Sequence, residues 1–464
     1  MFNYYLRKSF ATIFLFAFAG FFSLSIQAQT VNSVVPKGKA PIIIIPGLTG
    51  SELVNDKTGE VAWYKSKRPK DDDLRLPISP NLTRNRDSLV PRDVIRSLKL
   101  LKILPETEIY ERLIDALEKR GGYTEGKWDN PTIKGYEDTF YVFAYDWRRD
   151  NVENARLLVR KIENLKRLLK RPDLKFNVIA HSNGGLLARY AAMYGNTDLP
   201  VGKPKPTWIG EKYFDKVFLL GTPNEGSLQA LDILLNGVSL IKGINLPFVP
   251  DLSRFDIFTL PSVYQVLPHQ GTLTAYDENL KPLQIDIFDE KTWETYDWSI
   301  WKDNDFSTEF NATERTNARP FFRAMLNRAK RFHEALDANT SGKTLVSMYL
   351  VGADCKETPN SMVIYRDAKK NRWKTIFKAD SFERADGGKV SSDELKKVIY
   401  AMGDGVVTKR SLAAEALSGI NKTILPITSE IYLCEGHTKL VTSVEVQDKL
   451  FALLIGDAAV KATK

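Results

Sequence analysis

The sequence contains few of the residues from which metal centres and disulfide frameworks are built. Among its 464 residues there are only two cysteines, Cys355 and Cys434, and four histidines. The cysteines lack the short spacing of a metal-binding pair, so we expect neither a metal site nor a cofactor. Each cysteine follows a short apolar run, a pattern compatible with a disulfide in an oxidising compartment or with two buried thiols.

Long hydrophobic runs are also scarce, and no segment after residue 28 is apolar enough to span a bilayer. One apolar run, from Ala11 to Ile26, follows Arg7 and Lys8 and is followed by the small residue Ala28. This pattern is typical of a secretory signal peptide. We expect residues 1–28 to be cleaved and residues 29–464 to be exported, to the periplasm or as a secreted protein. A retained membrane anchor is the alternative, although the run is shorter than the about 20 residues of a spanning helix.

The basic residues are dispersed, and no nucleic-acid-binding motif accompanies them. The formal net charge is +9, and it is +7 once Arg7 and Lys8 leave with the leader. Such a charge attracts an exported protein to anionic lipid surfaces. Residues 156–171 and 366–374 are richest in Lys and Arg, and solvated helix faces explain them equally well. We therefore expect a peripheral membrane surface and no nucleic acid among the partners, and leave the oligomeric state open.

One stretch, residues 176–192, organises the rest of the chain. An apolar run at 178–180 is interrupted by His181 and Ser182, and two glycines and a helix-forming run follow. A strand, a sharp turn and a helix are typical of the nucleophile elbow of α/β-hydrolases, which exposes a serine Oγ above the sheet. Gly184 gives the turn its room, while Ala180 replaces the usual glycine with the next smallest residue. The alternative is an ordinary serine in a buried turn.

Strand and helix patterns alternate along much of the chain, which predicts a mostly parallel central sheet flanked by helices. Four consecutive isoleucines at 42–45 indicate a strand buried on both faces. Further strands are expected at 139–145, 178–180, 216–220, 344–351 and 431–434. Helices are expected at 106–120, 152–170, 186–192, 323–336, 412–417 and 444–454. The fold class is therefore α/β, in one domain.

Three regions depart from this alternation. Residues 51–105 are polar and rich in proline, and they are predicted to form an excursion over the site rather than a sheet element. Residues 224–320 are rich in aromatic residues and are predicted to form an inserted cap, with most rings in the cap's own core. Residues 356–400 are a polar insertion of unassigned role.

His437 is the expected general base for Ser182. It follows a strand, stands beside a glycine and comes later in the chain than the serine, the order this fold requires. The other three histidines are less suitable: His181 adjoins the serine and points elsewhere, His333 is expected to be solvated, and His269 is the reserve.

Asp404, flanked by two glycines and placed before His437, is the expected acid, with Asp354 as its competitor. A carboxylate here would fix the tautomer of His437 and stabilise its imidazolium. The backbone N–H groups of Leu48, in the turn after the first strand, and of Asn183 are the expected oxyanion hole. Each such donor contributes about 3–4 kcal/mol in other enzymes.

Six motifs, taken together, resemble the lecithin:cholesterol acyltransferase family, which includes lysosomal phospholipase A2 and many bacterial members. They are PGLTGSEL at 46–53, YDWR at 145–148, AHSNGG at 180–185, PSVYQVLP at 261–268, GDGVV at 403–407 and GH at 436–437. The resemblance covers roughly residues 40–445. It implies an α/β-hydrolase core with a membrane-binding excursion and a cap. It also implies Ser182, Asp404 and His437 as a triad, with Leu48 and Asn183 as oxyanion donors.

The sequence departs from that family at two places near the site. Asn183 stands where the family often has methionine, and residues 406–408 replace a loop that often contains threonine and proline. Neither departure removes a catalytic group, but both leave the acyl donor and acceptor open.

The leading prediction is an exported serine acyl-hydrolase or O-acyltransferase that acts on a lipid ester, most simply a phospholipid, through an acyl-enzyme. Water or an alcohol would take the acyl group, and the sequence does not choose between hydrolysis and transfer. The alternatives are a carboxylesterase or triacylglycerol lipase of the same fold, a peptidase or amidase, and a catalytically silent lipid-binding protein.

Trp63 and Tyr64 lie beside Lys65, Lys67 and Arg68 in the excursion. Aromatic rings favour the membrane interface, and cations favour anionic headgroups. Trp63 and Tyr64 are therefore predicted to contact substrate or membrane. The alternative is that Trp63 packs inward.

Overall fold

The computed structural model describes residues 39–64, 74–98, 107–133, 136–238, 252–339, 344–367, 371–418 and 425–462. These residues belong to one unit, Gly38–Lys464. The predicted leader, residues 1–28, lies outside them, as do Lys65, Lys67 and Arg68. Within the described ranges, no helix is both long and apolar enough to cross a membrane.

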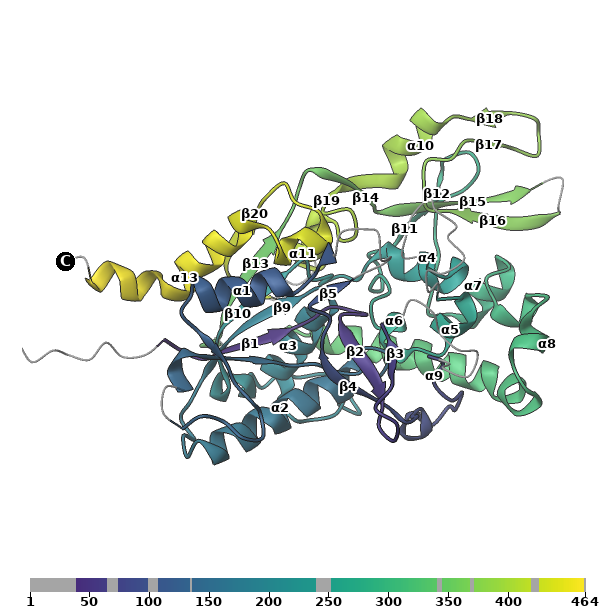
Figure 1. The fold of residues 1–464 in the computed structure, drawn as a ribbon. Helices are drawn as coiled ribbons and strands as arrows, with labels where there is room; N and C mark the ends of the chain where they lie inside the picture. Colours follow the sequence, from purple (N-terminus) through teal and green to yellow (C-terminus); the bar gives the residue numbers. More distant parts are fainter. Residues whose placement is uncertain are drawn as a thin grey trace, which may run out of the picture. The chain divides into compact units, whose positions relative to one another are not determined.

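The core is a seven-stranded sheet in the order β20-β13-β10-β9-β1-β8-β7, with every neighbouring pair parallel (Figure 1). All the predicted strands are present, and β7 is an addition. The four isoleucines of β1 are at most 1% exposed, as expected for a central parallel strand. The strands are β1 (Ile42–Ile45), β7 (Thr124–Glu125), β8 (Thr139–Val142), β9 (Phe176–His181), β10 (Phe214–Leu220), β13 (Ser347–Gly352) and β20 (Ile427–Tyr432).

Helices cover both faces of the sheet (Figure 1). Ile43 and Ile45 belong to the apolar cluster that contains α2 (Asn151–Leu168) and α3 (Asn183–Tyr194). Ile42 and Ile44 belong to the cluster that contains α1 (Glu111–Lys119) and α13 (Val444–Ala462). This alternation follows from the two-residue period of a strand. A parallel sheet covered on both faces, with a strand–serine–helix turn at its centre, is the predicted α/β-hydrolase fold.

Much of the aromatic region at 224–320 is helical. Its helices are α4 (Leu228–Asn236), α5 (Arg254–Phe258), α6 (Pro261–Tyr264), α7 (Glu290–Thr295), α8 (Phe306–Glu309) and the start of α9 (Ala312–Leu336). Its rings pack on one another: Trp293 is buried, and its ring centroid lies 5.6 Å from that of Trp298. The long helix α9 begins eleven residues before the predicted start because Asn311 and Glu314 form a capping box, and Pro320 lies inside it.

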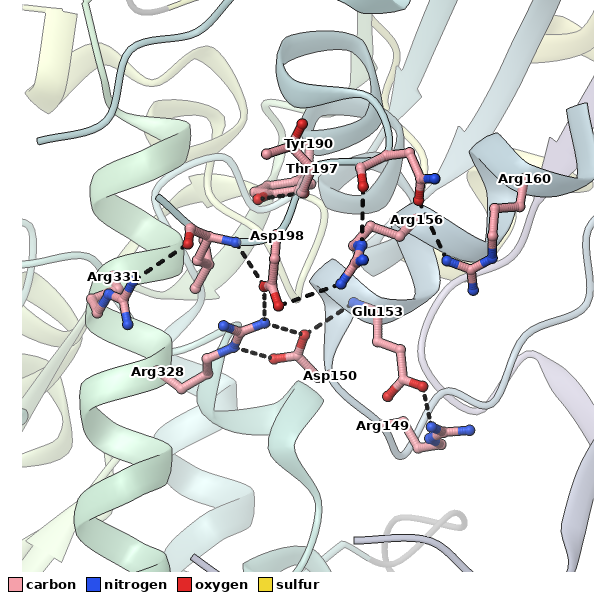
Figure 2. A network of polar contacts seen from close by, with 12 residues as sticks. Arg149, Asp150, Glu153, Arg156, Arg160, Tyr190, Thr197, Asp198, Arg328 and Arg331 are labelled. Atoms are coloured by element: carbon pink, nitrogen blue, oxygen red, sulfur yellow. Dashed lines mark hydrogen bonds and ion pairs between the residues drawn. The ribbon is translucent and has the colours of Figure 1, made fainter. Parts of the chain in front are cut away.

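A charged network holds α9 against the hydrolase core. Figure 2 shows Arg328 of α9 between Asp150 and Asp198, with nitrogen–oxygen distances of 3.0 and 2.8 Å. Asp150 is also the N-cap of α2, where its side chain accepts from the backbone N–H of Glu153. The helix α9, whose first turns belong to the cap, is therefore joined by an ion pair to the start of α2.

The region 51–105 was predicted to lack sheet structure, and this is wrong. It contains an antiparallel sheet in the order β3-β2-β4, separate from the central sheet, and part of a short ribbon, β5-β6. The strands are β2 (Ser51–Asn55), β3 (Val61–Trp63), β4 (Leu89–Val94), β5 (Ser97–Leu98) and β6 (Thr107–Glu108). Buried Arg148 fixes this region to the core by donating to Asp87 at 2.6 Å and Asp146 at 2.8 Å.

Trp63 does not face solvent or a membrane, so the prediction for it is also wrong. Its side chain is 1% exposed, and its indole N–H donates to the carbonyl of Thr49 at 2.8 Å. Its ring centroid lies 5.2 Å from that of Trp147. Pairing of β3 with β2 turns this residue towards the core. Tyr64 is half-buried and packs against the apolar cluster that contains Trp63 and Trp147. Burial raises the pKa of Tyr64.

The insertion at 356–400 is rich in strands. The ribbon β14-β19 (Lys356–Pro359, Tyr400–Gly403) ends immediately before Asp404. The insertion also includes β15 (Ser361–Asp367), β16 (Arg372–Ile376), β17 (Phe382–Glu383), β18 (Lys389–Val390) and α10 (Ser392–Ile399). Strands β15 and β16 share a sheet with β11 (Thr274–Tyr276) and β12 (Pro282–Leu283) of the cap. The insertion therefore leads directly into the loop of Asp404, and it pairs with strands of the cap.

Candidate active site

Ser182 lies in the turn between β9 and α3, in the strained conformation of an elbow. Its φ is +53°, a value rare for a residue other than glycine. A Cβ at Gly184 would lie 2.4 Å from the carbonyl oxygen of Pro46, and one at Gly47 would lie 2.9 Å from the Cβ of Ser182. The turn therefore requires glycine at both positions. Ala180, by contrast, sits within β9 and is fully buried there.

The three residues predicted as a triad lie together. His437 Nε2 is 3.0 Å from Ser182 Oγ, and His437 Nδ1 is 2.7 Å from Asp404 Oδ2. The other carboxylate oxygen of Asp404 accepts from the backbone N–H groups of Val406 and Val407, at 2.9 and 2.7 Å.

The electrostatics of Asp404 favour its ionised form. Burial acts to raise the pKa of Asp404, but the adjacent His437 and the two backbone donors outweigh it and lower the pKa. An ionised Asp404 holds the proton of His437 on Nδ1. The lone pair of Nε2 then faces the hydroxyl of Ser182, the geometry in which a base activates a nucleophile.

Three further features hold His437 in place. Its backbone N–H donates to the carbonyl of Asp404 at 2.9 Å. Gly221, with φ of +54°, lies so close that a Cβ there would be 2.9 Å from Asp404 Oδ2 and 3.0 Å from His437 Nδ1. Cys355 and Cys434 form a disulfide that joins the loops after β13 and β20, and Cys434 is three residues before His437.

His181 and Tyr110 form a hydrogen-bonded chain behind this group, which the sequence reasoning missed. The backbone N–H of Gly47 donates to Tyr110 Oη at 2.9 Å, and Tyr110 Oη lies 3.0 Å from His181 Nδ1. His181 Nε2 lies 3.1 Å from the carbonyl oxygen of His437. Because a carbonyl can only accept, Nε2 carries the proton and Tyr110 donates to Nδ1. Burial, and then the proximity of His437, lower the pKa of His181 to about 3 and keep it neutral.

The two predicted oxyanion positions are Leu48, in the turn after β1, and Asn183, the residue after Ser182. Asn183 is the first residue of α3, where backbone N–H groups have no partner within the helix. Leu48 follows Gly47 in the turn after β1, which the bond from Gly50 N–H to Gly47 O closes at 3.2 Å. Gly47, the neighbour of Leu48, lies against Ser182, where a Cβ on Gly47 would be 2.9 Å from the Cβ of the serine.

The competing residues lie elsewhere. Asp354 is at the surface beside Lys409, at 3.3 Å. His269 is fully buried, with Nδ1 2.7 Å from Asp337 Oδ2. His333 was predicted to be solvated, which is wrong: it is 2% exposed, and its Nε2 lies 2.9 Å from the carbonyl of Gln265. It faces inward from α9 and stacks on His269. No cluster of three or more potential metal ligands occurs among the residues described.

Comparisons with known proteins agree with this fold. "Lecithin-cholesterol acyltransferase-like 4" of Arabidopsis thaliana is 24% identical over 271 residues, which are 53% of this chain and 46% of that protein. The chain therefore matches about half the length of that relative. Among solved structures, the Tle4–Tli4 complex contains a chain that aligns with 89% of this chain and 98% of its own, at a TM-score of 0.54 and 14% identity. This likeness concerns the fold alone.

The sequence profile of one family also matches most of the chain. The profile described as "Lecithin:cholesterol acyltransferase" covers residues 108–416. The match includes the elbow, the cap and the Asp404 loop. The chain therefore belongs to the lecithin:cholesterol acyltransferase family.

Proposed function

We propose that this protein is a serine-dependent lipid acyl-hydrolase or O-acyltransferase. The observation that carries the proposal is the continuous line from Ser182 Oγ through His437 to Asp404, with distances of 3.0 and 2.7 Å. Family membership supports a lipid ester as the acyl donor. A silent lipid-binding protein would not need all three groups in this alignment.

In the proposed reaction, Ser182 Oγ attacks the ester carbonyl while His437 Nε2 takes the hydroxyl proton. The tetrahedral oxyanion accepts hydrogen bonds from the backbone N–H groups of Leu48 and Asn183. Collapse breaks the ester C–O bond, and His437 returns the proton to the departing alkoxide. The acyl group is left on Ser182. His437 then deprotonates water or an acceptor alcohol, which attacks the acyl carbonyl. Collapse breaks the bond to Ser182 Oγ, His437 returns the proton to that oxygen, and a fatty acid or a new ester is released.

We also propose export and a phospholipid donor. The pattern at residues 1–28 and the disulfide between Cys355 and Cys434 support an oxidising compartment outside the cytoplasm. The charge of +7 that remains without Arg7 and Lys8 supports attraction to anionic membranes. Inward-facing Trp63 does not contribute to that attraction.

The test is product analysis with phosphatidylglycerol vesicles, phosphatidylcholine vesicles, triacylglycerol and a short-chain nitrophenyl ester, each with and without an added alcohol. Wild type should release fatty acid and lysophospholipid, or form the ester of the alcohol, and Ser182→Ala should do neither. Turnover of the nitrophenyl ester alone would favour a carboxylesterase. A folded wild-type protein that turns over none of these substrates would refute the proposal.

A further inference from the structure

A second buried polar group is bonded to the turn after β1, through the carbonyl of Pro46. Asn183, Asn151 and Tyr145 are all fully buried. The side-chain amides of the two asparagines exchange hydrogen bonds, Asn151 Nδ2 to Asn183 Oδ1 at 2.8 Å and Asn183 Nδ2 to Asn151 Oδ1 at 2.9 Å. Asn183 Nδ2 also donates to Tyr145 Oη at 3.1 Å, and Tyr145 Oη donates to the carbonyl of Pro46 at 3.0 Å.

The direction of every bond in this group is fixed by its chemistry. The carbonyl of Pro46 can only accept, so the hydroxyl of Tyr145 donates to it. Burial raises the pKa of Tyr145, which keeps that proton in place. The oxygen of Tyr145 must then accept, so Asn183 must present its NH₂ group there and its oxygen to Asn151. No other side chain of this shape supplies the same two donors and one acceptor.

We propose that the side chain of Asn183, acting through Tyr145, is a positioning element for the oxyanion hole. This inference rests on the function proposed above. Asn183 contributes its own backbone N–H as one donor. Its side chain, through Tyr145, holds Pro46, which is two residues before the other donor, Leu48. One residue thus supplies one half of the hole and fixes the other half.

The same group is anchored to the cap. The backbone N–H of Asn151 donates to Gln265 Oε1 at 2.7 Å, and Gln265 Nε2 donates to Asp150 Oδ2 at 2.8 Å. Asp150 in turn holds Arg328 of α9 at 3.0 Å (Figure 2). The turn after β1 is therefore connected through hydrogen bonds to α6, whose C-cap is Gln265, and to α9, so its position depends on how the cap is seated.

Three substitutions test the positioning role of the Asn183 side chain. All three keep the backbone N–H groups of Leu48 and Asn183. Asn183→Asp keeps the shape but replaces two donors with an acceptor, so the hydroxyl of Tyr145 turns to the carboxylate and releases Pro46. Tyr145→Phe removes the bond to Pro46 outright. Asn183→Met, the residue common in the family, removes the amide but leaves Tyr145 bonded to Pro46. We expect kcat to fall roughly tenfold to a hundredfold in the first two variants, less than the about 10²–10³ of losing a donor. The fall in Asn183→Met should be only a few-fold.

The readout is a split between kcat and KM, with inhibition by a trifluoromethyl ketone as a mimic of the oxyanion. KM should change little, and the inhibition constant should rise by the same factor as kcat/KM falls. Matched controls make the same chemical changes at buried sites away from this turn. Asn85→Asp alters a buried amide that donates to the carbonyl of Pro77, and Tyr194→Phe alters a hydroxyl that donates to the carbonyl of Ala335. Both controls should retain kcat.

Two outcomes would overturn the inference in an active wild-type background. In one, Asn183→Asp and Tyr145→Phe lose no more kcat than the controls. In the other, the loss appears in KM while inhibition by the ketone is unchanged. Near-ultraviolet circular dichroism checks the fold of each variant, and Tyr145→Phe, with no buried charge, keeps the test available if Asn183→Asp does not fold. An inactive wild type that no fluorophosphonate labels would instead refute the proposed function, and this inference with it.

Discussion

Two histidine–aspartate pairs with the same separation occur among the described residues, and one of these two faces a serine. His437 Nδ1 lies 2.7 Å from Asp404, and His269 Nδ1 lies 2.7 Å from Asp337. The first pair lies in loops that follow strands, beside the elbow. The second lies at the junction of the cap with α9 and is covered by the stacked ring of His333, whose centroid is 4.0 Å from that of His269.

The two pairs differ in the hydrogen bonds that the second oxygen of each carboxylate accepts. The free oxygen of Asp404 accepts two backbone N–H groups, and the pKa of Asp404 is lowered. The corresponding oxygen of Asp337 is buried without a hydrogen-bond partner among the described residues, and burial raises the pKa of Asp337 to about 7. Burial also lowers the pKa of His269 far below its ordinary value. A short histidine–aspartate distance is therefore not enough for a catalytic site. The carboxylate must also be stabilised by hydrogen-bond donors, and a nucleophile must lie beside the histidine.

The largest contrast is expected between the two histidines. His437→Ala should lower kcat by about 10⁵–10⁶, by comparison with other triads, because the serine loses its base. His269→Ala should leave kcat within a few-fold and should mainly lower the melting temperature, because it opens a cavity. Steady-state kinetics on a soluble ester measures both. A larger loss of kcat in His269→Ala would reverse the assignment of the base.

The aspartates should differ almost as much. Asp404→Asn should cost about 10⁴ in kcat, because an amide cannot hold the productive tautomer of the histidine. Asp337→Asn and Asp354→Asn are the matched controls, and each should retain kcat within a few-fold. If Asp354→Asn were inactive and Asp404→Asn active, the acid role would pass to Asp354.

The chain through Tyr110 and His181 should have a moderate effect. Tyr110→Phe removes a hydroxyl that bonds the Gly47 N–H and His181, and a fall of up to about thirtyfold in kcat is expected from two lost hydrogen bonds of roughly 1 kcal/mol each. His181→Gln can keep a donor towards the carbonyl of His437, whereas His181→Asn keeps only an acceptor near Tyr110. The loss in kcat should therefore be greater in His181→Asn. Equal activity of both variants with wild type would show that this chain does not position His437.

The smallest effect concerns stability and pH. The pKa of Asp337 is about 7 in the folded protein against an ordinary 3.8, so the folded state binds more protons between these values. Stability contributed by this group is therefore lost as pH rises from about 4 to about 7. Relative to Asp337→Asn, which cannot titrate, the melting temperature of wild type should fall by a few degrees across this window. Parallel curves for the two proteins would contradict the raised pKa. The pKa of Asp404 is lowered, so the stability that Asp404 contributes is lost only as pH falls below this window.

The features predicted from sequence were those with local signals. The isoleucines of β1, the glycines around the elbow and the glycines beside Asp404 can each be recognised within a few consecutive residues, although the partners they pack against are distant in the chain. The errors involve burial by distant partners: Trp63 is enclosed by Trp147, and His333 by His269. Tyr110 is 71 residues from His181, and no pattern in the sequence joins them. The catalytic role of Ser182 remains a prediction.

Covalent labelling by a fluorophosphonate, with the modified peptide identified by mass spectrometry, tests the central claim most directly. The account predicts one modified residue, Ser182, in wild type. It predicts no labelling in Ser182→Ala, strongly slowed labelling in His437→Ala, and unchanged labelling in His269→Ala, because only the first histidine activates the serine. Modification of another serine, or no modification of a folded wild-type protein, would contradict it.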